Sequence, residues 1–544
     1  MLPCVIFEDE HLLVVNKPAG MNTHAPSPFA GEGIYDWLRH QEPRWARLAI
    51  IHRLDKETSG VIVFGKTALA NRSLTEQFAN RSIGKKYLLL TAHALKRNAF
   101  VAKSKIARAG EKYVSGASGE MAETRFRTVA ADVSRLTLKS KRSEPTHVGC
   151  YTLIETEPVT GRTHQIRVHA AANGFPILGD TLYGGAPFQR VCLHAAEITL
   201  RHPAMGEELT FRTPADFESD ARQALRGALI DAEETNAFRD IHGASDGWPG
   251  WYVERLGNFL LSQGEGSVTE KQKKHLAATG SSVRGVYHKI LSRQVRGASV
   301  TEASPRLLFG QAAPERFAIC ENGLQFELSF NEGYSVGLFL DQRDNRRRFL
   351  TGHVAVGFSL FKENGDRQDA CPTVLNVFAY TCGFSVCAAK GGARTTSLDL
   401  SKKYLEWGRR NFLLNGLDPS EHDFIYGDAF DWMRRLAKKG RAFDVIVLDP
   451  PTFSQSKERG AFRVATHYGE LVSAALPLLK TNGVLFASTN AAEWPPEKFL
   501  ATIEKGVRAA KRNILAQHYV PQPPDFPISR AEPAYLKTVW MRIS

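Results

Sequence analysis

The hydrophobic positions of the first 215 residues form short, compact runs. VIFED, HLLVVNK, GVIVFG and KKYLLL are such runs, and Gly, Pro or Asn bounds them. Short apolar runs between turn-forming residues are typical of β-strands. This region is therefore predicted to be mostly strands with short helices, and it ends at FRTPADF. A polar, helix-like stretch follows, in which Leu225 and Leu229 are four residues apart and share one face.

The pattern changes twice more along the chain. From about residue 235 to 314 it predicts a small mixed α/β unit with the turn-rich segment DGWPGWYVERLG. Beyond that, strand candidates such as VLNVF and FDVIVLDPP alternate with helical stretches such as KKYLEWGRRNFLLNG. This alternation predicts βαβ crossovers and a largely parallel sheet. We expect a multidomain chain with parts at 1–215, 216–313 and 314–544, the middle part holding a linker helix and an accessory α/β domain.

Composition and charge narrow the class of protein. A chain of 544 residues is long enough for three or four folding units. The net charge of +13 favours a polyanionic partner, because Lys and Arg neutralise phosphates. Seven cysteines without a CxxC pair predict reduced thiols in a cytoplasmic protein and no metal site. No signal peptide or apolar run of about 18 residues appears, so we expect no membrane partner. The oligomeric state is left open.

A first group of polar residues lies in IHRLDKETSG, residues 51–60. If this segment is extended, Arg53 and Asp55 project from one side and Leu54 from the other. Alone, such a pair would be an ordinary surface ion pair. The segment GRTHQIRVH, residues 161–169, alternates in the same way, and it could be a basic edge strand with Thr163, Gln165 and Arg167 on one face.

Together these segments resemble the RluA family of pseudouridine synthases over essentially all of residues 1–215, which predicts an α+β domain with a mixed sheet. The motifs, in order, are VVNKPAG (14–20), HRLDKETSG (52–60), KKY (85–87), GRTHQIRVH (161–169) and PILGDTLYGG (176–185). The resemblance implies that Asp55 is the catalytic aspartate, acting on the ribose of the target uridine by attack or by proton abstraction. It implies that Arg167 pairs with Asp55, that Tyr87 packs on the base, and that Arg53 helps to extrude the nucleotide.

Some relatives in that family carry an RNA-binding S4 domain before the catalytic domain, whereas this chain starts almost directly at the first strand. RNA affinity is therefore expected from other basic segments. The candidates are the stretch from Lys96 to Lys112 and the cluster Lys139, Lys141 and Arg142. Their alternative reading is a solvated charged face.

A second group of polar residues follows the strands of the last part. VLNVFAYTCGFS, residues 374–385, runs from a strand through a loop into a helix, and open α/β sheets bind ligands at such loops. It holds only Gly383 where a dinucleotide fingerprint needs three glycines. Asp399, Asp428 and Asp449 then come at the ends of three successive strands. Asp399 is placed to accept both hydroxyls of an adenosine ribose.

This order resembles class I S-adenosylmethionine-dependent methyltransferases with a Rossmann-like fold, and more closely the 23S rRNA methyltransferases of the RlmI and RlmK type, over about 235–544. The further motifs are DGWPGWYVERLG (246–257), GLFLDQRDNRR (337–347) and DPPTFSQSK (449–457). The resemblance implies S-adenosylmethionine as cofactor and assigns roles to ten residues. Asn376, Phe378 and Gly383 would line its methionine part, and Asp399 would hold the ribose. Asp428 and Ala429 would flank the adenine, and Gln342 and Arg343 would lie near the cofactor. Asp449 and Phe453 would face the acceptor base.

Two departures from the relatives bear on the chemistry. The loop reads TCG where relatives often have TGG, so Cys382 should fit only if its backbone is not left-handed. Cytosine-C5 methyltransferases need a cysteine thiolate as nucleophile. In RlmI-like enzymes it would fall near Ser488-Thr489-Asn490, and no cysteine is there. A nitrogen acceptor needs no such adduct, so we expect methylation of a guanine nitrogen.

The leading hypothesis is a bifunctional enzyme acting on large-subunit ribosomal RNA. In one alternative, the first half is a non-catalytic platform that presents RNA to the methyltransferase. In another, the second half methylates a small molecule and the fusion is incidental. The retained Asp55, Tyr87 and Arg167 argue against the platform, and the basic balance argues against the small-molecule substrate.

Overall fold

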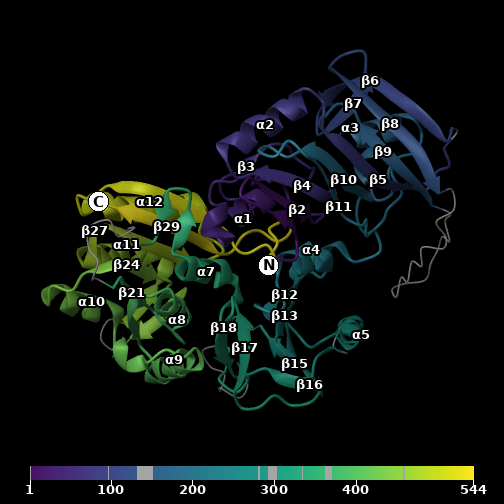
Figure 1. Cartoon of the computed structure of the whole chain (residues 1–544). Helices are drawn as coiled ribbons and strands as arrows, with labels where there is room; N and C mark the ends of the chain where they lie inside the picture. The colour runs from purple at the N-terminus through teal and green to yellow at the C-terminus, as the bar shows by residue number, and fades with distance from the viewer. Residues whose placement is uncertain are drawn as a thin grey trace. The chain divides into compact units, whose positions relative to one another are not determined.

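A computed structural model describes residues 2–95, 97–130, 151–279, 282–291, 303–333, 335–361, 371–456 and 460–544 (Figure 1). The chain divides into two compact units. The first contains residues 1–25, 33–37 and 47–231, and the second contains residues 26–32, 38–46 and 232–544. The helix-like stretch after FRTPADF thus belongs to the first unit, whereas we expected it with the second part. Lys96 and the basic cluster Lys139, Lys141 and Arg142 lie outside the described residues.

The first unit is built on an 11-stranded mixed sheet. Its path is β1-β2-β4-β10-β5-β9-β8-β6-β7, with β3 beside β4 and β11 beside β10. Most neighbours are antiparallel, while β4 and β10 are parallel. The strands are β1 (Val5–Glu8), β2 (Leu12–Lys17), β3 (Ala49–Ile50), β4 (Ser59–Gly65), β5 (Gly84–Thr91), β6 (Ala99–Ala109), β7 (Lys112–Gly116), β8 (Glu120–Ala130), β9 (Thr152–Pro158), β10 (Leu193–Arg201) and β11 (Glu208–Arg212).

Helices α2 (Ala68–Ala79), α3 (Gln165–Ala172) and α4 (Ala221–Leu229) belong to this unit, and α1 (Ile34–Gln41) is divided between the two. Helix α2 begins where the Thr67 hydroxyl accepts a hydrogen bond from the backbone N–H of Ala70, a typical N-cap. Helix α3 corrects the sequence interpretation, which treated GRTHQIRVH as a strand. Its residues from Gln165 onward are helical, and the Gln165 side chain is anchored to the Thr124 hydroxyl and the Glu123 carbonyl.

The second unit contains a five-stranded sheet in the order β12-β13-β14-β15-β16 and a seven-stranded sheet in the order β23-β22-β21-β24-β27-β29-β28. The smaller sheet consists of β12 (Ala237–His242), β13 (Trp251–Leu256), β14 (Phe259–Gly264), β15 (Gly285–Ile290) and β16 (Arg306–Gly310). The larger consists of β21 (Thr373–Val377), β22 (Arg394–Asp399), β23 (Asp423–Tyr426), β24 (Phe443–Leu448), β27 (Leu479–Thr489), β28 (Ile514–Val520) and β29 (Lys537–Ile543).

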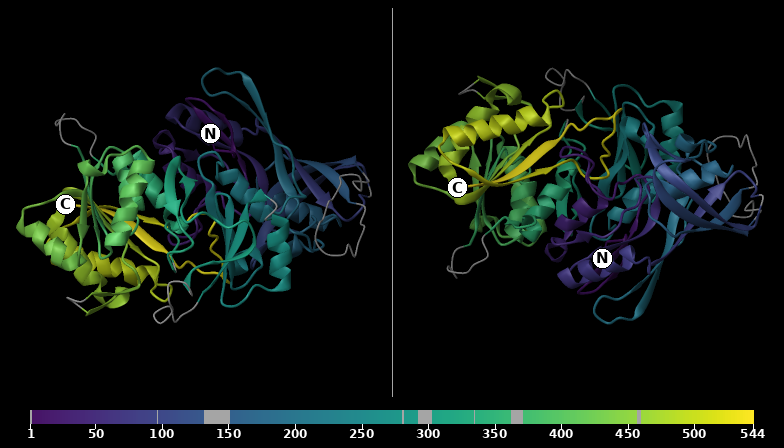
Figure 2. Two further views of the ribbon diagram at one scale, coloured as in Figure 1. Left: turned by 90° about the horizontal axis from the view of Figure 1, so that it is seen from below. Right: turned by 90° about the horizontal axis from the view of Figure 1, so that it is seen from above.

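Strands β23, β22, β21, β24 and β27 are parallel, and β29 is antiparallel to both of its neighbours. The predicted βαβ alternation is therefore confirmed. Helices cover both faces of the sheet, as Figures 1 and 2 show. They are α7 (Arg343–Thr351), α8 (Gly383–Lys390) and α9 (Lys402–Leu414) on one face and α10 (Ala429–Lys438), α11 (Val464–Ala475) and α12 (Pro496–Ala509) on the other.

Alternating strand residues fill the two cores of this sheet. In β24, Val445 and Val447 pack with α7 and α8, while Ile446 and Leu448 pack with α10 and α11. A strand buried on both faces reads as a continuous apolar run, which explains FDVIVLD. Among the described residues, no helix combines the length and the apolar character that crossing a bilayer requires.

Candidate active sites

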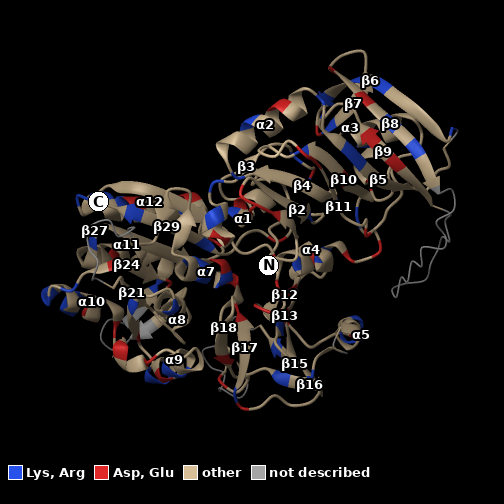
Figure 3. Ribbon diagram, viewed as in Figure 1, with Lys and Arg blue, Asp and Glu red and all other residues tan. Residues whose placement is uncertain are grey.

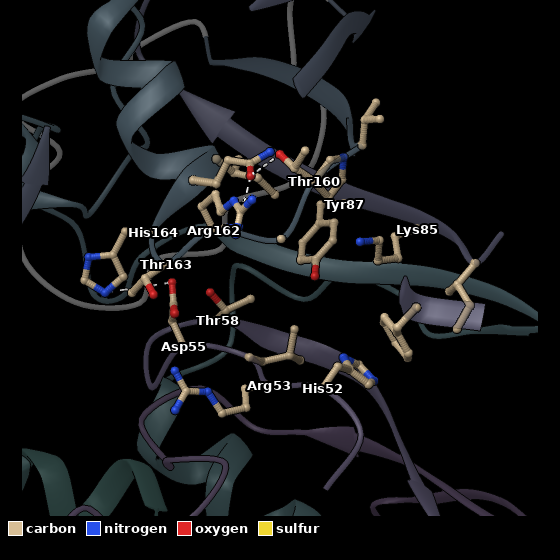
Figure 4. Close-up of a pocket in the computed structure, with 18 of the residues that line it drawn as sticks. His52, Arg53, Asp55, Thr58, Lys85, Tyr87, Thr160, Arg162, Thr163 and His164 are labelled. Atoms are coloured by element: carbon tan, nitrogen blue, oxygen red, sulfur yellow. Dashed lines mark hydrogen bonds and ion pairs between the residues drawn. The ribbon is translucent and has the colours of Figure 1, made fainter. Parts of the chain in front are cut away.

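The first unit has a cavity of about 570 Å³ at one edge of β5 (Figure 4). The segment before β4, strand β5 and the loop before α3 supply its walls. Asp55 is the only carboxylate among the described residues that line it. The other polar lining residues include His52, Arg53, Thr58, Arg81, Lys85, Tyr87, Thr160, Arg162, Thr163, His164, Gln165 and Arg167.

Asp55 is largely enclosed, with 29% of its side chain exposed. Its Oδ2 lies 4.0 Å from Nη1 of Arg167 and 4.0 Å from Nε2 of His164. Burial raises the pKa of Asp55, and the neighbouring His164, when protonated, and Arg167 oppose that rise, while burial lowers the pKa of His164 itself. The predicted neighbours Asp55, Arg53, Tyr87 and Arg167 all line one cavity.

Arg167 makes its strongest contact with a residue that the sequence interpretation missed. Its Nε and Nη2 donate to the two carboxylate oxygens of Asp180 at 2.7 and 2.8 Å, and both side chains are almost fully buried. Its remaining nitrogen, Nη1, points toward Asp55 and Glu57. Arg167 is therefore clamped by Asp180 and presents one edge to Asp55. Asp180 lies in the quoted motif PILGDTLYGG, and its carboxylate was the available signal.

His164 is a second residue that was missed. It precedes α3 with a left-handed backbone, φ 54°, which is uncommon for a residue other than glycine and concentrates at functional sites. Its Nδ1 lies 2.8 Å from the hydroxyl of Tyr183, which also accepts a hydrogen bond from the backbone N–H of Tyr113. These contacts direct Nε2 toward Asp55.

Arg53 and Tyr87 complete the predicted set. Among the described residues, the Arg53 guanidinium makes one polar contact, from Nη1 to Nε2 of His24 at 3.4 Å, which leaves its other nitrogens for a ligand. Tyr87 lies on β5, and burial raises the pKa of its hydroxyl. Leu54 is buried, as its alternation with Arg53 and Asp55 predicted.

The second unit has its own cavity, also of about 570 Å³, at the carboxyl ends of β21, β22, β23 and β24. Of the predicted cofactor residues, Phe378, Gly383, Asp399, Asp428, Ala429 and Gln342 line it. Asn376 and Arg343 do not line it. Asn376 donates to the Ser385 hydroxyl inside the sheet. Arg343 is buried in a two-bond contact with Asp525, 2.6 and 3.0 Å.

The loop after β21 wraps around Asp399. The backbone N–H of Tyr380 donates to Oδ2 and that of Ser401 donates to Oδ1, each at 2.8 Å. Phe378, Tyr380 and Cys382 all have positive φ angles. Cys382 has φ 64°, so the expectation that it would avoid the left-handed conformation is wrong. Its neighbour on α9 is Gly408, where a Cβ would lie 2.3 Å from the Cys382 sulfur, so the missing side chain makes room for the thiol.

Asp428 and Asp449 occupy successive strand ends around the cavity. Asp428 caps α10 by accepting from the backbone N–H groups of Phe430 and Asp431. Asp449 accepts a hydrogen bond from Nε2 of Gln342 at 3.3 Å, and the same nitrogen donates to the Ser488 hydroxyl at 2.8 Å. Burial, reinforced by the charge of Asp341, raises the pKa of Asp449 to about 6.

The side chains that line the cavity near Asp449 differ from those that the sequence predicted. Asp341, which sequence reasoning did not single out, also lines the cavity and accepts a hydrogen bond from the Tyr535 hydroxyl at 2.9 Å. Phe453, predicted to face the acceptor base, is not among the lining residues, whereas Thr452 and Ser454 on either side of it are. Phe339, with 49% of its surface exposed, is an aromatic side chain that does line the cavity.

The donor set of this cavity fits S-adenosylmethionine. Four carboxylates line it, at positions 341, 399, 428 and 449, and they suit a sulfonium cation with two ribose hydroxyls. Leu398, Leu400 and Phe430 offer an apolar surface for the adenine. No cysteine is among the described residues that line the cavity. Burial raises the pKa of the nearby Cys382 thiol to about 12, which keeps it protonated.

Comparisons with known proteins agree with this division. Residues 11–172 match the family model of RNA pseudouridylate synthases, and residues 270–542 match that of S-adenosylmethionine-dependent methyltransferases. A ribosomal RNA large subunit methyltransferase of Deinococcus radiodurans is 32% identical over 337 residues, which are 59% of this chain and 76% of the relative. Ribosomal RNA large subunit methyltransferase K/L of a Psychrobacter species is 35% identical over 242 residues, 44% of this chain and 27% of the relative. A solved methyltransferase structure in complex with SAH is 31% identical, with a TM-score of 0.50 and coverage of 59% of this chain and 79% of that chain.

Proposed function

Because the chain belongs to the S-adenosylmethionine-dependent methyltransferase family and carries an RNA pseudouridylate synthase domain, we propose that it modifies large-subunit ribosomal RNA twice. One site isomerises a uridine to pseudouridine, and the other transfers a methyl group to a guanine nitrogen. The RNA substrate is consistent with the net charge of +13 and with the rRNA methyltransferases among the relatives. An enzyme with this substrate would act in the cytoplasm.

The observation that supports the synthase activity is that Asp55 is the one carboxylate among the described residues lining the first cavity and lies beside Arg167 and His164. Asp55 must be ionised to act on the ribose, whether it attacks the sugar or abstracts a proton. Arg167, held by Asp180, and His164, held by Tyr183, both lie 4.0 Å from Asp55. A mere RNA-binding platform has no need of a carboxylate placed among cations in this way, since a carboxylate repels phosphates.

The observation that supports a nitrogen acceptor is the chemistry of the second cavity. S-adenosylmethionine supplies an electrophilic methyl group when bound. A carbon acceptor would need a thiolate, and the described lining residues include none. Asp341 and Asp449 can accept hydrogen bonds from the donor edge of guanine, and the exposed ring of Phe339 can stack on the base.

The test is mass-spectrometric mapping of large-subunit rRNA from cells that contain or lack the chain, and from cells with single-residue variants. Asp55→Asn should remove one pseudouridine and leave the methyl mark. If Asp55→Asn removes no pseudouridine, the result would favour the alternative in which the first half is a non-catalytic RNA-binding platform. Cys382→Ser and Cys387→Ser should both leave the methyl mark, and a 5-methylcytosine product lost in either variant would overturn the nitrogen acceptor.

A further inference from the structure

Lys85 lines the first cavity as a cation without an acidic partner. Among the described residues, no carboxylate lies within ion-pair distance of its ammonium. Two other cations that line the cavity, on the loop before α3 and on α3, already have acidic partners. Arg162 pairs with Glu120, and Arg167 pairs with Asp180. Burial lowers the pKa of Lys85, and no charged neighbour offsets that effect. A partly buried ammonium without a partner is unfavourable unless a ligand supplies the negative charge.

The surroundings of Lys85 are apolar or neutral. Its Nζ lies 5.9 Å from the centre of the Phe78 ring, which stacks on the His52 ring at 4.8 Å. The His52 imidazole accepts a hydrogen bond from the backbone N–H of Val63, and burial lowers its pKa to about 3. Lys85 is therefore a positive charge of this end of the cavity, and Arg81, which follows α2, is another cation that lines it.

Strand geometry places Lys85 beside the predicted base position. Lys85 and Tyr87 are two residues apart on β5, so both side chains project from the same face of the strand. Figure 4 shows Tyr87 between Asp55 and Lys85. If the ribose is at Asp55 and the uracil packs on Tyr87, the far edge of the uracil faces Lys85. Lys86 projects to the opposite face, where it pairs with Glu197 at 3.1 Å.

The proposed isomerisation generates negative charge at this position. The C1′–N1 bond of uridine breaks, and its electron pair leaves with the base, whichever way Asp55 acts on the sugar. The detached uracil is then an anion, delocalised over N1 and the carbonyl oxygens. A C1′–C5 bond forms next, and as it forms the Asp55–C1′ ester breaks in the attack route, whereas Asp55 returns the proton to the sugar in the abstraction route. The proton on C5 is lost and N1 gains a proton, so the product is an isomer of the substrate.

We propose that Lys85 is a further catalytic residue, whose ammonium stabilises the uracil anion between bond cleavage and bond formation. No proton needs to leave the lysine. Preorganised donors aimed at developing charge are among the largest contributions to catalysis, and removal of one donor typically costs about 10²–10³ in rate. The proposal rests on the synthase activity proposed above.

The experiment compares Lys85→Gln with Lys86→Gln in the full chain, under single-turnover conditions with saturating RNA. We expect Lys85→Gln to slow pseudouridine formation about 100-fold or more and Lys86→Gln to change it less than about threefold. Lys85→Arg should recover part of the rate because it keeps the charge. Replacing the target uridine with 5-fluorouridine gives a more stable leaving anion, so the defect in base detachment should shrink. The unfolding temperature of the same preparations reports correct folding of the first unit, and methyl transfer reports only the second unit.

Three outcomes would overturn the inference. Equal rates for Lys85→Gln and Lys86→Gln would show that the charge is not used. An unchanged saturated rate, with a salt slope of RNA binding reduced by about one, would make Lys85 a phosphate contact instead. A lower unfolding temperature of the first unit in Lys85→Gln, with no recovery of the rate in Lys85→Arg, would assign Lys85 a structural role. If the unaltered chain forms no pseudouridine, the proposed function fails and this inference fails with it.

Discussion

At the scale of single residues, the synthase cavity depends on how one arginine is divided among three carboxylates. Arg167 gives two donors to Asp180 and leaves its third edge to Asp55 and Glu57. The bidentate contact fixes the guanidinium plane, which a single contact to Asp55 would not do. Asp180 thus positions Arg167 beside Asp55, the proposed catalytic carboxylate.

The contact of Arg167 with Asp180 should affect mainly the stability of the first unit, and its contact with Asp55 should affect the synthase activity. Arg167→Met leaves Asp180 buried without its partner, and we expect a loss of about 3–5 kcal/mol in the stability of the first unit. Arg167→Met combined with Asp180→Asn removes the stranded charge, so it should regain part of that stability and remain inactive. Thermal unfolding and pseudouridine formation measure the two effects. An active double variant would contradict a role for Arg167 beside Asp55.

The acid limb of the synthase rate should follow the charge around Asp55. Because Asp55 must be ionised, the rate rises with pH through its pKa. The negative charge of Glu57 raises that pKa, so Glu57→Gln should lower it and shift the acid limb to lower pH. The shift should be a fraction of a unit, since 42% of the Glu57 side chain is exposed. Glu76→Gln, an exposed change on α2, is the matched control, and an upward shift in Glu57→Gln would contradict this assignment.

At the scale of elements, the apolar runs were predictable and the polar segments were not. Strand β4 is buried throughout and β24 at every position except Asp444, so their composition identifies them. GRTHQIRVH alternates like a strand, yet it forms a left-handed residue followed by α3, because contacts from Gln165 to β8 determine its conformation. The strand ends carrying Asp399, Asp428 and Asp449 were predictable from the βαβ pattern. Asp180, His164 and Asp341 act through partners distant in sequence, which periodicity does not reveal.

The fit between the loop after β21 and α9 gives a prediction at this scale. Gly408→Ala would place a Cβ 2.3 Å from the Cys382 sulfur. We expect a destabilisation of about 1–3 kcal/mol from overpacking. Cys382→Gly removes the thiol and the left-handed strain together, so the double variant Cys382→Gly with Gly408→Ala should recover most of the loss. Urea unfolding of the unaltered chain, the two single variants and the double variant gives a double-mutant cycle. Additive changes in the free energy of unfolding would show that the two residues do not interact.

At the scale of the whole molecule, some basic residues of the expected RNA-binding region are neutralised by acidic neighbours. In Figure 3, strands β6 and β8 carry Lys and Arg beside the acidic residues of β9. Lys103 pairs with Glu123 and Arg127 pairs with Glu155. The expected RNA-binding stretch from Lys96 to Lys112 therefore has fewer free cations than its sequence suggests. Lys105 and Lys112 are exposed and have no recorded ion pair among the described residues.

Binding of ribosomal RNA fragments should still weaken steeply with salt, by about 10³ or more between 50 and 200 mM, if six or more phosphates are contacted. Lys105→Gln should reduce the slope of log affinity against log salt by about one, whereas Lys103→Gln should change it less because that lysine is already paired. Filter binding over a salt series measures both slopes. A flat dependence would rule out a phosphate-dominated interface.

The presence of two separate cavities in one chain has a consequence for the cell. Each molecule carries one site of each kind, so the two activities are always made in equal numbers. Changes in the amount of enzyme therefore change the number of both sites by the same factor. Any ribosomes that carry only one of the two marks would therefore report unequal turnover or RNA access at the two sites, and their proportion measures that imbalance directly.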